Sequence, residues 1–403
     1  MGTRTRAFAL SVAAMATVSA GIVTATPALA DGPGVGTPTI VTVGDSYISG
    51  EGGRWAGNTN TSSSNVDALG STAYYDNASN TAEVISGCHR SKAAEAHIGG
   101  GVISANLACS GARTYTQTGS SFKPGVDFYD NGAGLQGQAK MLQAYAATRN
   151  VKMVVLSIGG NDFNFADIVQ TCVSDFLLSP SWWPDYCNDD SSVTANFTSA
   201  NVTAKTTAIK NAILNVRTAM TNAGYATTAY KIVVQNYMSP LPTSTGFRYS
   251  QSGYTRQNTG GCGFWNNDAN WANNTALPLI NGAVSNAVTQ AGGNAVLMNL
   301  TSAFTGRRLC ENTVGLLEEK ALATWQSAGA SDKTEWIAQI RTVSTVFGPY
   351  QVQESFHPNY WGQLALRNCV RQAYNGGTPR GGTCARGTLT GRNALGEPNM
   401  TLS

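Results

Sequence analysis

The sequence is poor in charge and, beyond its first thirty residues, in long apolar runs. Asp, Glu, Lys and Arg make up 12% of the 403 residues, and the formal net charge is +3. There is no basic cluster and no alternation of basic and aromatic residues, the patterns typical of nucleic-acid binding. After residue 30, no apolar run approaches the roughly 18 residues that indicate a membrane-spanning helix. We therefore expect neither a nucleic-acid partner nor stable insertion into a membrane.

Several other patterns are missing. No C-x-x-C pair occurs, which weakens the case for a zinc site or a thioredoxin-like redox site, and we expect no bound metal. The chain has only three histidines, His89, His97 and His357, so few side chains can act as a general base near neutral pH. Internal repeats and Pro/Ser-rich linkers are also lacking, which indicates a single domain after the start.

The first thirty residues have the pattern of a secretory signal peptide. Arg4 and Arg6 precede a run of apolar and small residues, and Ala28-Leu29-Ala30 forms an A-x-A cleavage site. No twin-Arg pair is present, which favours the general secretory route. We expect residues 1–30 to be removed and the mature protein to be secreted and extracellular.

The cysteines agree with export. All eight lie after the predicted signal peptide, and an even count in a secreted chain indicates disulfides rather than a metal site. Eight cysteines allow many connectivities, of which the pairing of sequence neighbours is the simplest. That pairing joins Cys88 to Cys109, Cys172 to Cys187, Cys262 to Cys310, and Cys369 to Cys384.

Strand and helix patterns alternate along the mature chain. We expect strands at 40–43, 101–108, 152–158, 231–237 and 295–300, and helices at 135–146, 202–220, 279–288 and 360–374. The alternation predicts βαβ units, and therefore a mostly parallel sheet in a three-layer α/β/α domain. We expect this domain to span 31–385, with an irregular segment at 171–197 and a loosely packed tail at 386–403.

Four short motifs follow one another along this pattern. They are Gly44-Asp45-Ser46, Ala108-Cys109-Ser110-Gly111-Ala112, Gly159-Gly160-Asn161-Asp162 and Glu354-Ser355-Phe356-His357-Pro358. Each alone has a plainer interpretation, because Ser46 can cap a helix, Asn161 can belong to a turn and His357 can be an ordinary partly buried residue. The first three end predicted strands, however, and parallel strands end at one rim of the sheet, where ligands bind.

The residue types in these motifs suit acyl transfer. A serine hydroxyl needs a base within hydrogen-bond reach, and Ser46 and His357 form such a pair of candidates. Glu354 lies three residues before His357 and is a candidate to orient it. The oxyanion of a tetrahedral intermediate needs preorganised donors, for which the candidates are Gly111, Asn161 and the main-chain N–H of Ser46.

The four motifs together resemble the motif blocks of the GDSL, or SGNH, hydrolase superfamily of esterases and lipases. The sequences GDSYISGEGG, GCHRS and ACSGA, with the paired cysteines, are similar to the secreted actinobacterial branch, and the likeness spans Val41 to Cys369. The resemblance implies a flavodoxin-like sheet of five parallel strands in the order 2-1-3-4-5. It also implies hydrolysis of carboxylic esters without a cofactor. No G-x-S-x-G elbow is present, which argues against a lipase of the α/β-hydrolase type.

Carried over position by position, the resemblance makes Ser46 the nucleophile and His357 the general base and acid. Gly111 and Asn161, with the Ser46 N–H, would form the oxyanion hole. The family usually has Asp where this sequence has Glu354, so the acid is either Glu354, which we expect, or a main-chain carbonyl. Asp45 and Asp162 are expected to be structural.

Two further groups have open roles. His89 and Arg90 either border the substrate pocket or, as we expect, belong to a surface loop tied by Cys88. A set of aromatic residues in irregular segments is expected to pack in the core, with an apolar rim facing the substrate as the alternative: Trp182, Trp183, Phe264, Trp265 and Trp271.

The expected function is a secreted esterase or lipase that acts as a monomer on small-molecule or lipid esters. A phospholipase A or a polysaccharide O-acetyl esterase would use the same site. A catalytically silent extracellular binding protein is the alternative from another class, and the presence of both Ser46 and His357 argues against it.

Overall fold

A seven-stranded sheet forms the centre of the computed structural model, which describes residues 32–341 and 352–403. The predicted signal peptide lies outside the described residues. The strand order is β2-β1-β3-β4-β5-β6-β7, and all neighbours are parallel except β6 and β7. The strands are β1 (Pro38–Gly44), β2 (Ile103–Asn106), β3 (Asn150–Ser157), β4 (Lys231–Gln235), β5 (Ala295–Asn299), β6 (Gly382–Ala385) and β7 (Thr401–Leu402).

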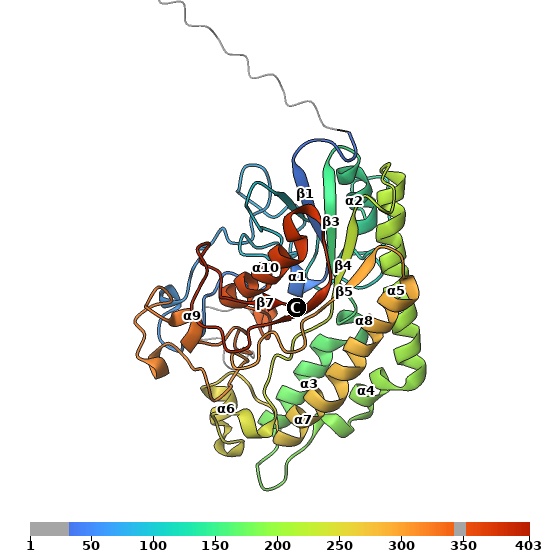
Figure 1. The fold of residues 1–403 in the computed structure, drawn as a ribbon. Coiled ribbons are helices and arrows are strands. Elements are labelled where there is room, and N and C mark those ends of the chain that lie inside the picture. Colours follow the sequence, from blue (N-terminus) through green and yellow to red (C-terminus); the bar gives the residue numbers. More distant parts are fainter. Residues whose placement is uncertain (1–31, 342–351) are drawn as a thin grey trace, which may run out of the picture. The chain divides into compact units, whose positions relative to one another are not determined.

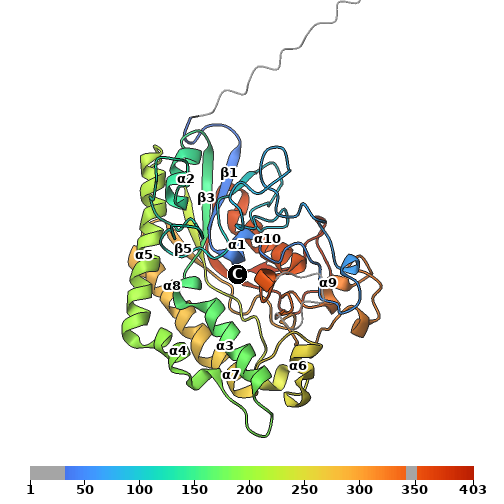
Figure 2. The same cartoon turned by 180° about the vertical axis from the view of Figure 1, so that it is seen from behind.

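Helices cover both faces of the sheet, which confirms the predicted three-layer α/β/α class (Figures 1 and 2). One face carries α2 (Gln138–Ala146), α5 (Ser199–Asn222) and α8 (Leu277–Ala291), and the other carries α10 (Tyr360–Tyr374). The remaining helices are α1 (Ser46–Ser49), α3 (Phe165–Leu178), α4 (Ser191–Thr194), α6 (Thr255–Asn258), α7 (Asn266–Trp271) and α9 (Ala330–Lys333).

The core lies between the sheet and these helices. Val41, Val155 and Val233 stand on three neighbouring strands and are fully buried, as expected of a parallel sheet that is covered on both faces. On α5, Ile209 and Ile213 are spaced by one helical turn and are also fully buried. Periodicity therefore decides which side of each element turns inward.

The sheet corrects one sequence expectation. The predicted order 2-1-3-4-5 is confirmed, but the sheet has seven strands rather than five. The two additional strands, β6 and β7, are short and extend the edge beyond β5. Because Arg386, Met400 and Leu402 are buried and β7 pairs with β6, the prediction of a loosely packed tail at 386–403 is wrong. Arg371 of α10 also pairs there with the buried Glu397.

The segment predicted to be irregular at 171–197 is the second correction. Its first part belongs to α3, a helix of 14 residues that begins at Phe165. Figures 1 and 2 show α3 beyond the carboxyl ends of the strands, beside α7 and α8. The helix therefore lies on the side of the sheet where Ser46 is found.

All four predicted disulfides are confirmed. They are Cys88–Cys109, Cys172–Cys187, Cys262–Cys310 and Cys369–Cys384. Cys369, within α10, is joined to Cys384 of β6, and the other three disulfides link segments that lie outside the strands.

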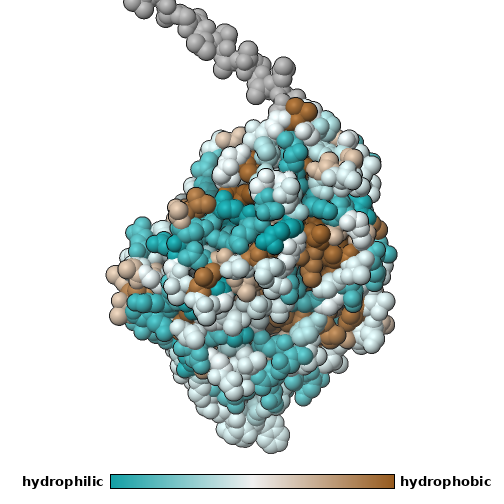
Figure 3. All heavy atoms as spheres, in the orientation of Figure 1, coloured by the Kyte–Doolittle hydropathy of each residue, from teal (hydrophilic) through white to brown (hydrophobic). Residues whose placement is uncertain are grey.

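The face of the molecule drawn in Figure 3 is mostly hydrophilic, with hydrophobic side chains gathered in separate areas. The largest of these areas lies near the place where Figure 1 draws β4 and β5, and Ala295, Val296 and Leu297 of β5 are half-buried. Within 32–341 and 352–403, no helix has both the length and the apolar character needed to cross a membrane.

Candidate active site

Ser46 is held at the carboxyl end of β1 by a turn that requires glycine. Gly44 has φ of 135°, and a Cβ there would lie 1.9 Å from the carbonyl oxygen of Ser157. Asp45 caps the next helix, α1, by accepting a hydrogen bond of 3.1 Å from the Tyr47 N–H. Ser46 is thus the first residue of α1, where its own N–H has no acceptor within the helix.

His357 faces Ser46 from the other end of the chain. Its Nε2 lies 2.7 Å from the Ser46 hydroxyl oxygen. Its Nδ1 lies 2.9 Å from the main-chain carbonyl oxygen of Ser355, which can only accept, so the ring proton belongs on Nδ1. Nε2 is then the unprotonated nitrogen and can accept the serine proton.

The loop that carries His357 has an unusual backbone. Phe356 has φ of 65°, which is rare for a residue with a large side chain. The Tyr47 hydroxyl donates a hydrogen bond of 3.1 Å to the Phe356 carbonyl, and the Tyr47 ring packs beside the imidazole at a centroid distance of 5.3 Å. The helix that carries the serine therefore also fixes the loop that carries the histidine.

Glu354 does not hold the position expected of a triad acid. Its two carboxylate oxygens accept hydrogen bonds from Trp55 Nε1 at 2.7 Å and from the Tyr74 hydroxyl at 2.5 Å, while the Ser355 carbonyl occupies His357 Nδ1. This arrangement supports the main-chain carbonyl, the alternative to Glu354 as the group that orients His357. The physical reason is that residues 354 and 357 lie on a tight turn, which brings the nearer main-chain oxygen to the ring.

A different carboxylate acts on His357 through space. Glu51 is fully buried just after α1, and its N–H donates to the Ser46 carbonyl at 3.2 Å. Burial lowers the pKa of His357, and the negative charge of Glu51 opposes that shift. Glu51 is in turn held by His89, whose Nδ1 lies 2.6 Å from it. Desolvation is the largest single influence on His89 and disfavours its charged form, but the hydrogen bond to Glu51 and the negative charges of Glu51, Glu83 and Glu354 together outweigh it and raise the pKa of His89.

The candidate oxyanion donors reach the same cleft from two other strands. Ser46, Gly111, Asn161 and His357 all line it. Gly111 follows β2 with φ of 79°, and within the described residues its N–H donates to no other protein group. The Asn161 side-chain amide donates to the Ala112 carbonyl at 2.9 Å, which leaves its second N–H available.

Asp45 and Asp162 brace the loops. Desolvation raises the pKa of Asp45 to about 7, against hydrogen bonds from Tyr237 and Tyr47. Asp162 accepts bonds from the Thr114 N–H at 3.1 Å and from its hydroxyl at 2.6 Å, which joins the third motif to the second.

Tyr237 is a residue that sequence analysis missed. Its hydroxyl donates to Asp45 and accepts from the Gly160 N–H at 2.8 Å, so it joins the first motif to the third. Nothing in the sequence near Tyr237 indicates this role, because both partners are distant along the chain.

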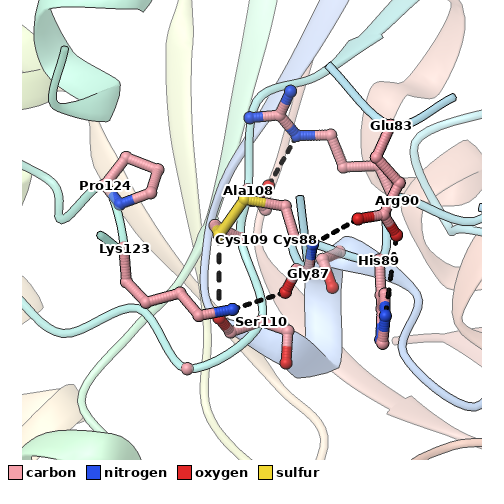
Figure 4. The surroundings of a disulfide bond; sticks show 12 residues. Glu83, Gly87, Cys88, His89, Arg90, Ala108, Cys109, Ser110, Lys123 and Pro124 are labelled. Carbon is pink, nitrogen blue, oxygen red and sulfur yellow. Dashed lines mark hydrogen bonds and ion pairs between the residues drawn. A yellow bond between two sulfur atoms is a disulfide. The ribbon is translucent and has the colours of Figure 1, made fainter. Parts of the chain in front are cut away.

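Figure 4 shows how the second motif is tied in place. The Cys88–Cys109 disulfide links it to the GCHRS segment, and Arg90 donates to the Ala108 carbonyl at 2.7 Å. Lys123 donates to the Gly87 carbonyl at 2.5 Å, and a Cβ on Gly111 would lie 3.7 Å from its Cε. His89 and Arg90 thus stand behind the loop of Gly111 and do not line the cleft.

The cleft has a volume of about 880 Å³ and two chemically distinct sides. Four residues of α3, spaced by four positions, form an apolar stripe along it: Phe165, Val169, Val173 and Leu177. Leu277 and Ile280 of α8 lie on the apolar side too, whereas Lys123, Arg341 and Gln353 are polar lining residues. A further cavity of about 60 Å³ shares the lining residues Phe165, Val169 and Ile280.

The aromatic set divides between core and surface. Phe264 and Trp265 are buried and Trp271 is half-buried, as expected for core packing. Trp182 and Trp183 are 80% and 74% exposed, so the core prediction is wrong for these two. Within the part of the chain that the structure describes, no group of three or more His, Cys, Asp and Glu side chains is placed to hold a metal ion.

No family model matches the chain, and no curated protein matches it. Among solved structures it is similar to an extracellular lipase from Streptomyces rimosus, with 19% identity over 81% of this chain and 94% of that chain and a TM-score of 0.42. Phospholipase A1 from Streptomyces albidoflavus NA297 is 20% identical over 81% of this chain and 95% of that chain, with a TM-score of 0.41. Est24, a carbohydrate acetylesterase from Sinorhizobium meliloti, is 12% identical over 64% of this chain and 83% of that chain, with a TM-score of 0.27. The function proposed below rests on the residues of this chain.

Proposed function

We propose that the protein is a serine hydrolase that cleaves carboxylic esters through an acyl-enzyme. The observation that carries the proposal is the distance of 2.7 Å between the Ser46 hydroxyl oxygen and His357 Nε2, at the wall of a large cleft. The predicted signal peptide and the four disulfides support an extracellular place of action, and we propose that the protein acts there as a monomer.

His357 acts as base and then as acid. Nε2 takes the proton of the Ser46 hydroxyl as its oxygen attacks the ester carbonyl carbon, and the carbonyl oxygen becomes an oxyanion. Collapse of this intermediate breaks the bond to the alcohol, which leaves with the proton from Nε2. A water molecule then attacks the acyl-enzyme by the same route and releases the acid and free Ser46.

The oxyanion would accept hydrogen bonds from the main-chain N–H groups of Gly111 and Ser46 and from the second amide N–H of Asn161. Removing one such donor from an oxyanion hole costs about 3–4 kcal/mol of transition-state stabilisation. The imidazolium that forms in each half-reaction would be stabilised by the Ser355 carbonyl at Nδ1 and by the buried charge of Glu51.

The shape of the cleft favours esters of long acyl chains. The stripe along α3 runs about 18 Å from Phe165 to Leu177 and gives an apolar chain a continuous surface. An O-acetyl ester would leave that surface unused. A phospholipase A activity is the second candidate, since Lys123 and Arg341 line the same cleft and can receive an anionic headgroup.

Replacement of the nucleophile tests the proposal. Ser46→Ala should lower kcat for p-nitrophenyl esters by about ten-thousand-fold or more, because within residues 32–341 and 352–403 no other hydroxyl is hydrogen-bonded to His357 Nε2. Initial rates on acetate to long-chain esters and on phosphatidylcholine measure it, with thermal unfolding as the control for folding. Activity in Ser46→Ala equal to that of the parent would contradict the nucleophile, and an inactive parent would favour the silent binding protein.

A further inference from the structure

The loop that follows α3 exposes large apolar side chains. Leu178, Trp182 and Trp183 are 86%, 80% and 74% exposed, the highest values among the large hydrophobic side chains exposed in the described residues. All three fall within six residues. In Figures 1 and 2 this loop, drawn in green after α3, projects away from the helices around it. Burying one such side chain is worth about 1.5–3 kcal/mol, so leaving three in water is costly unless something covers them.

The loop is built to hold these side chains outward. The Cys172–Cys187 disulfide closes its base. The Trp183 N–H donates to the Pro180 carbonyl at 2.9 Å, which closes a turn with Trp182 near its tip. The Ser179 hydroxyl accepts from the Asp185 N–H at 2.9 Å, across the loop. The two indole side chains are therefore exposed on an ordered turn.

The loop is continuous with the substrate cleft. Leu177 and Leu178, the last residues of α3, line the cleft, and Leu178 is also part of the exposed set. An apolar chain that left a surface held by Trp182 and Trp183 would meet the stripe of α3 directly. The exposed set thus lies where a water-insoluble substrate would enter.

The charges around the loop indicate what kind of surface covers it. The segment 165–198 contains five aspartates, Asp167, Asp175, Asp185, Asp189 and Asp190, and no Lys or Arg. Desolvation, with the fields of three of these neighbours, raises the pKa of Asp175 to about 6. Such a segment is repelled by anionic lipid, whereas tryptophan favours the lipid–water boundary and attracts quaternary ammonium groups.

We propose that Leu178, Trp182 and Trp183 form a docking surface for a zwitterionic lipid–water interface, such as the choline-bearing surface of phosphatidylcholine. The proposal rests on the proposed ester hydrolase, because it assigns the entrance of that enzyme's cleft. Docking holds the mouth of the cleft against the lipid, so a single ester can move from the interface along α3 toward Ser46.

Vesicle binding tests the proposal independently of catalysis. The Ser46→Ala protein, which leaves lipid intact, is mixed with phosphatidylcholine vesicles, and binding is followed by co-sedimentation and by quenching of tryptophan fluorescence with brominated lipid. The double variant Trp182→Ala/Trp183→Ala in the same background should bind about tenfold or more weakly. Leu395→Ala, which removes a side chain 61% exposed in the tail, is the matched control and should bind as the parent does. Vesicles of phosphatidylglycerol should bind less than those of phosphatidylcholine.

The double variant with Ser46 retained completes the test. It should keep parental kcat/KM on a soluble short-chain p-nitrophenyl ester and lose rate on phosphatidylcholine vesicles. Unchanged vesicle binding, a loss equal to that of Leu395→Ala, or stronger binding to phosphatidylglycerol would overturn the proposal. So would a parent that is dimeric by light scattering and becomes monomeric in the double variant without any vesicle binding, since a second copy would then cover the patch. If the parent hydrolyses no ester, the proposed function fails while vesicle binding still decides the docking surface.

Discussion

At the scale of single residues, the partner of His357 sets the character of the site. A carbonyl oxygen fixes the tautomer and the ring plane as a carboxylate would, but it carries only a partial charge. A full negative charge that acts on His357 comes from Glu51, which is buried and held by an ion pair with His89. Orientation and charge, which one aspartate supplies in a Ser-His-Asp triad, are here supplied by two groups.

Removing the charge of Glu354 tests whether this carboxylate takes part in catalysis. Glu354→Gln keeps groups that can bind Trp55 and Tyr74, so we expect the fold to persist and kcat to fall by less than about tenfold. Loss of a true triad acid costs about ten-thousand-fold. Steady-state rates on a soluble ester measure the difference, and a loss of several orders of magnitude with unchanged thermal unfolding would restore Glu354 as the acid.

The charge of Glu51 should be visible in the pH profile. A negative charge favours the imidazolium, so Glu51→Gln should lower the pKa of His357 and move the acidic limb of kcat/KM to lower pH. His89 carries the opposite charge and lowers the pKa of His357, so His89→Gln should move the same limb to higher pH. Rates across the acidic range measure both shifts. Shifts of the same sign in the two variants would show that Glu51 and His89 act only through the fold.

At the scale of elements, α3 supplies an apolar side of the cleft, so we expect it to set the preference for the acyl chain. Its cleft-facing residues recur at every fourth position, which places them on one side of the helix along the length of the cavity. Their partners across the cleft come from α8 and from the loop after β4. Chain-length preference should therefore depend on this helix and not on the motifs that hold the reacting atoms.

Filling the middle of the stripe tests this. Val169→Trp places a bulky ring in the cleft, so kcat/KM for long-chain p-nitrophenyl esters should fall by about tenfold or more while that for the acetate changes little. Thr171→Trp, on the same helix outside the cleft lining, is the matched control. An equal loss on both esters in Val169→Trp would show that the stripe does not bind the acyl chain.

At the scale of the whole molecule, local signals predicted the frame and missed what depends on distant contacts. The strands before Ser46 and Asn161 were predictable because buried parallel strands are short runs of β-branched residues, and α10 was predictable from its helical period. The helix α3 was missed although its apolar residues Phe165, Ile168, Val169, Cys172, Val173 and Phe176 have helical spacing, because the Trp182-Trp183-Pro184 loop that follows was taken to be one irregular segment with it. The strands β6 and β7 are too short to leave a pattern.

The candidate site divides in the same way. Ser46, His357, Gly111 and Asn161 could be named from short motifs at strand ends, and the structure brings all four to one cleft. Their placement as catalytic groups stays a prediction until the variants are measured. The role of Glu354 could not be read from spacing, because a turn decides whether a side chain or a main-chain oxygen reaches the ring. The exposure of Trp182 and Trp183 likewise depends on how their loop folds.

The Ser355 main-chain carbonyl at His357 Nδ1 has a consequence for how the site responds to mutation. Every amino acid has a main-chain oxygen, so no codon change at position 355 can delete the hydrogen-bond acceptor; it can alter only the Ser355 side chain, which separately accepts a bond from the Arg341 N–H at 2.9 Å. A saturation screen for lost activity should therefore recover Ser46, His357 and the proposed oxyanion donor Asn161, but no orienting acid. Substitution at position 355 is expected to leave the tautomer of His357 unchanged.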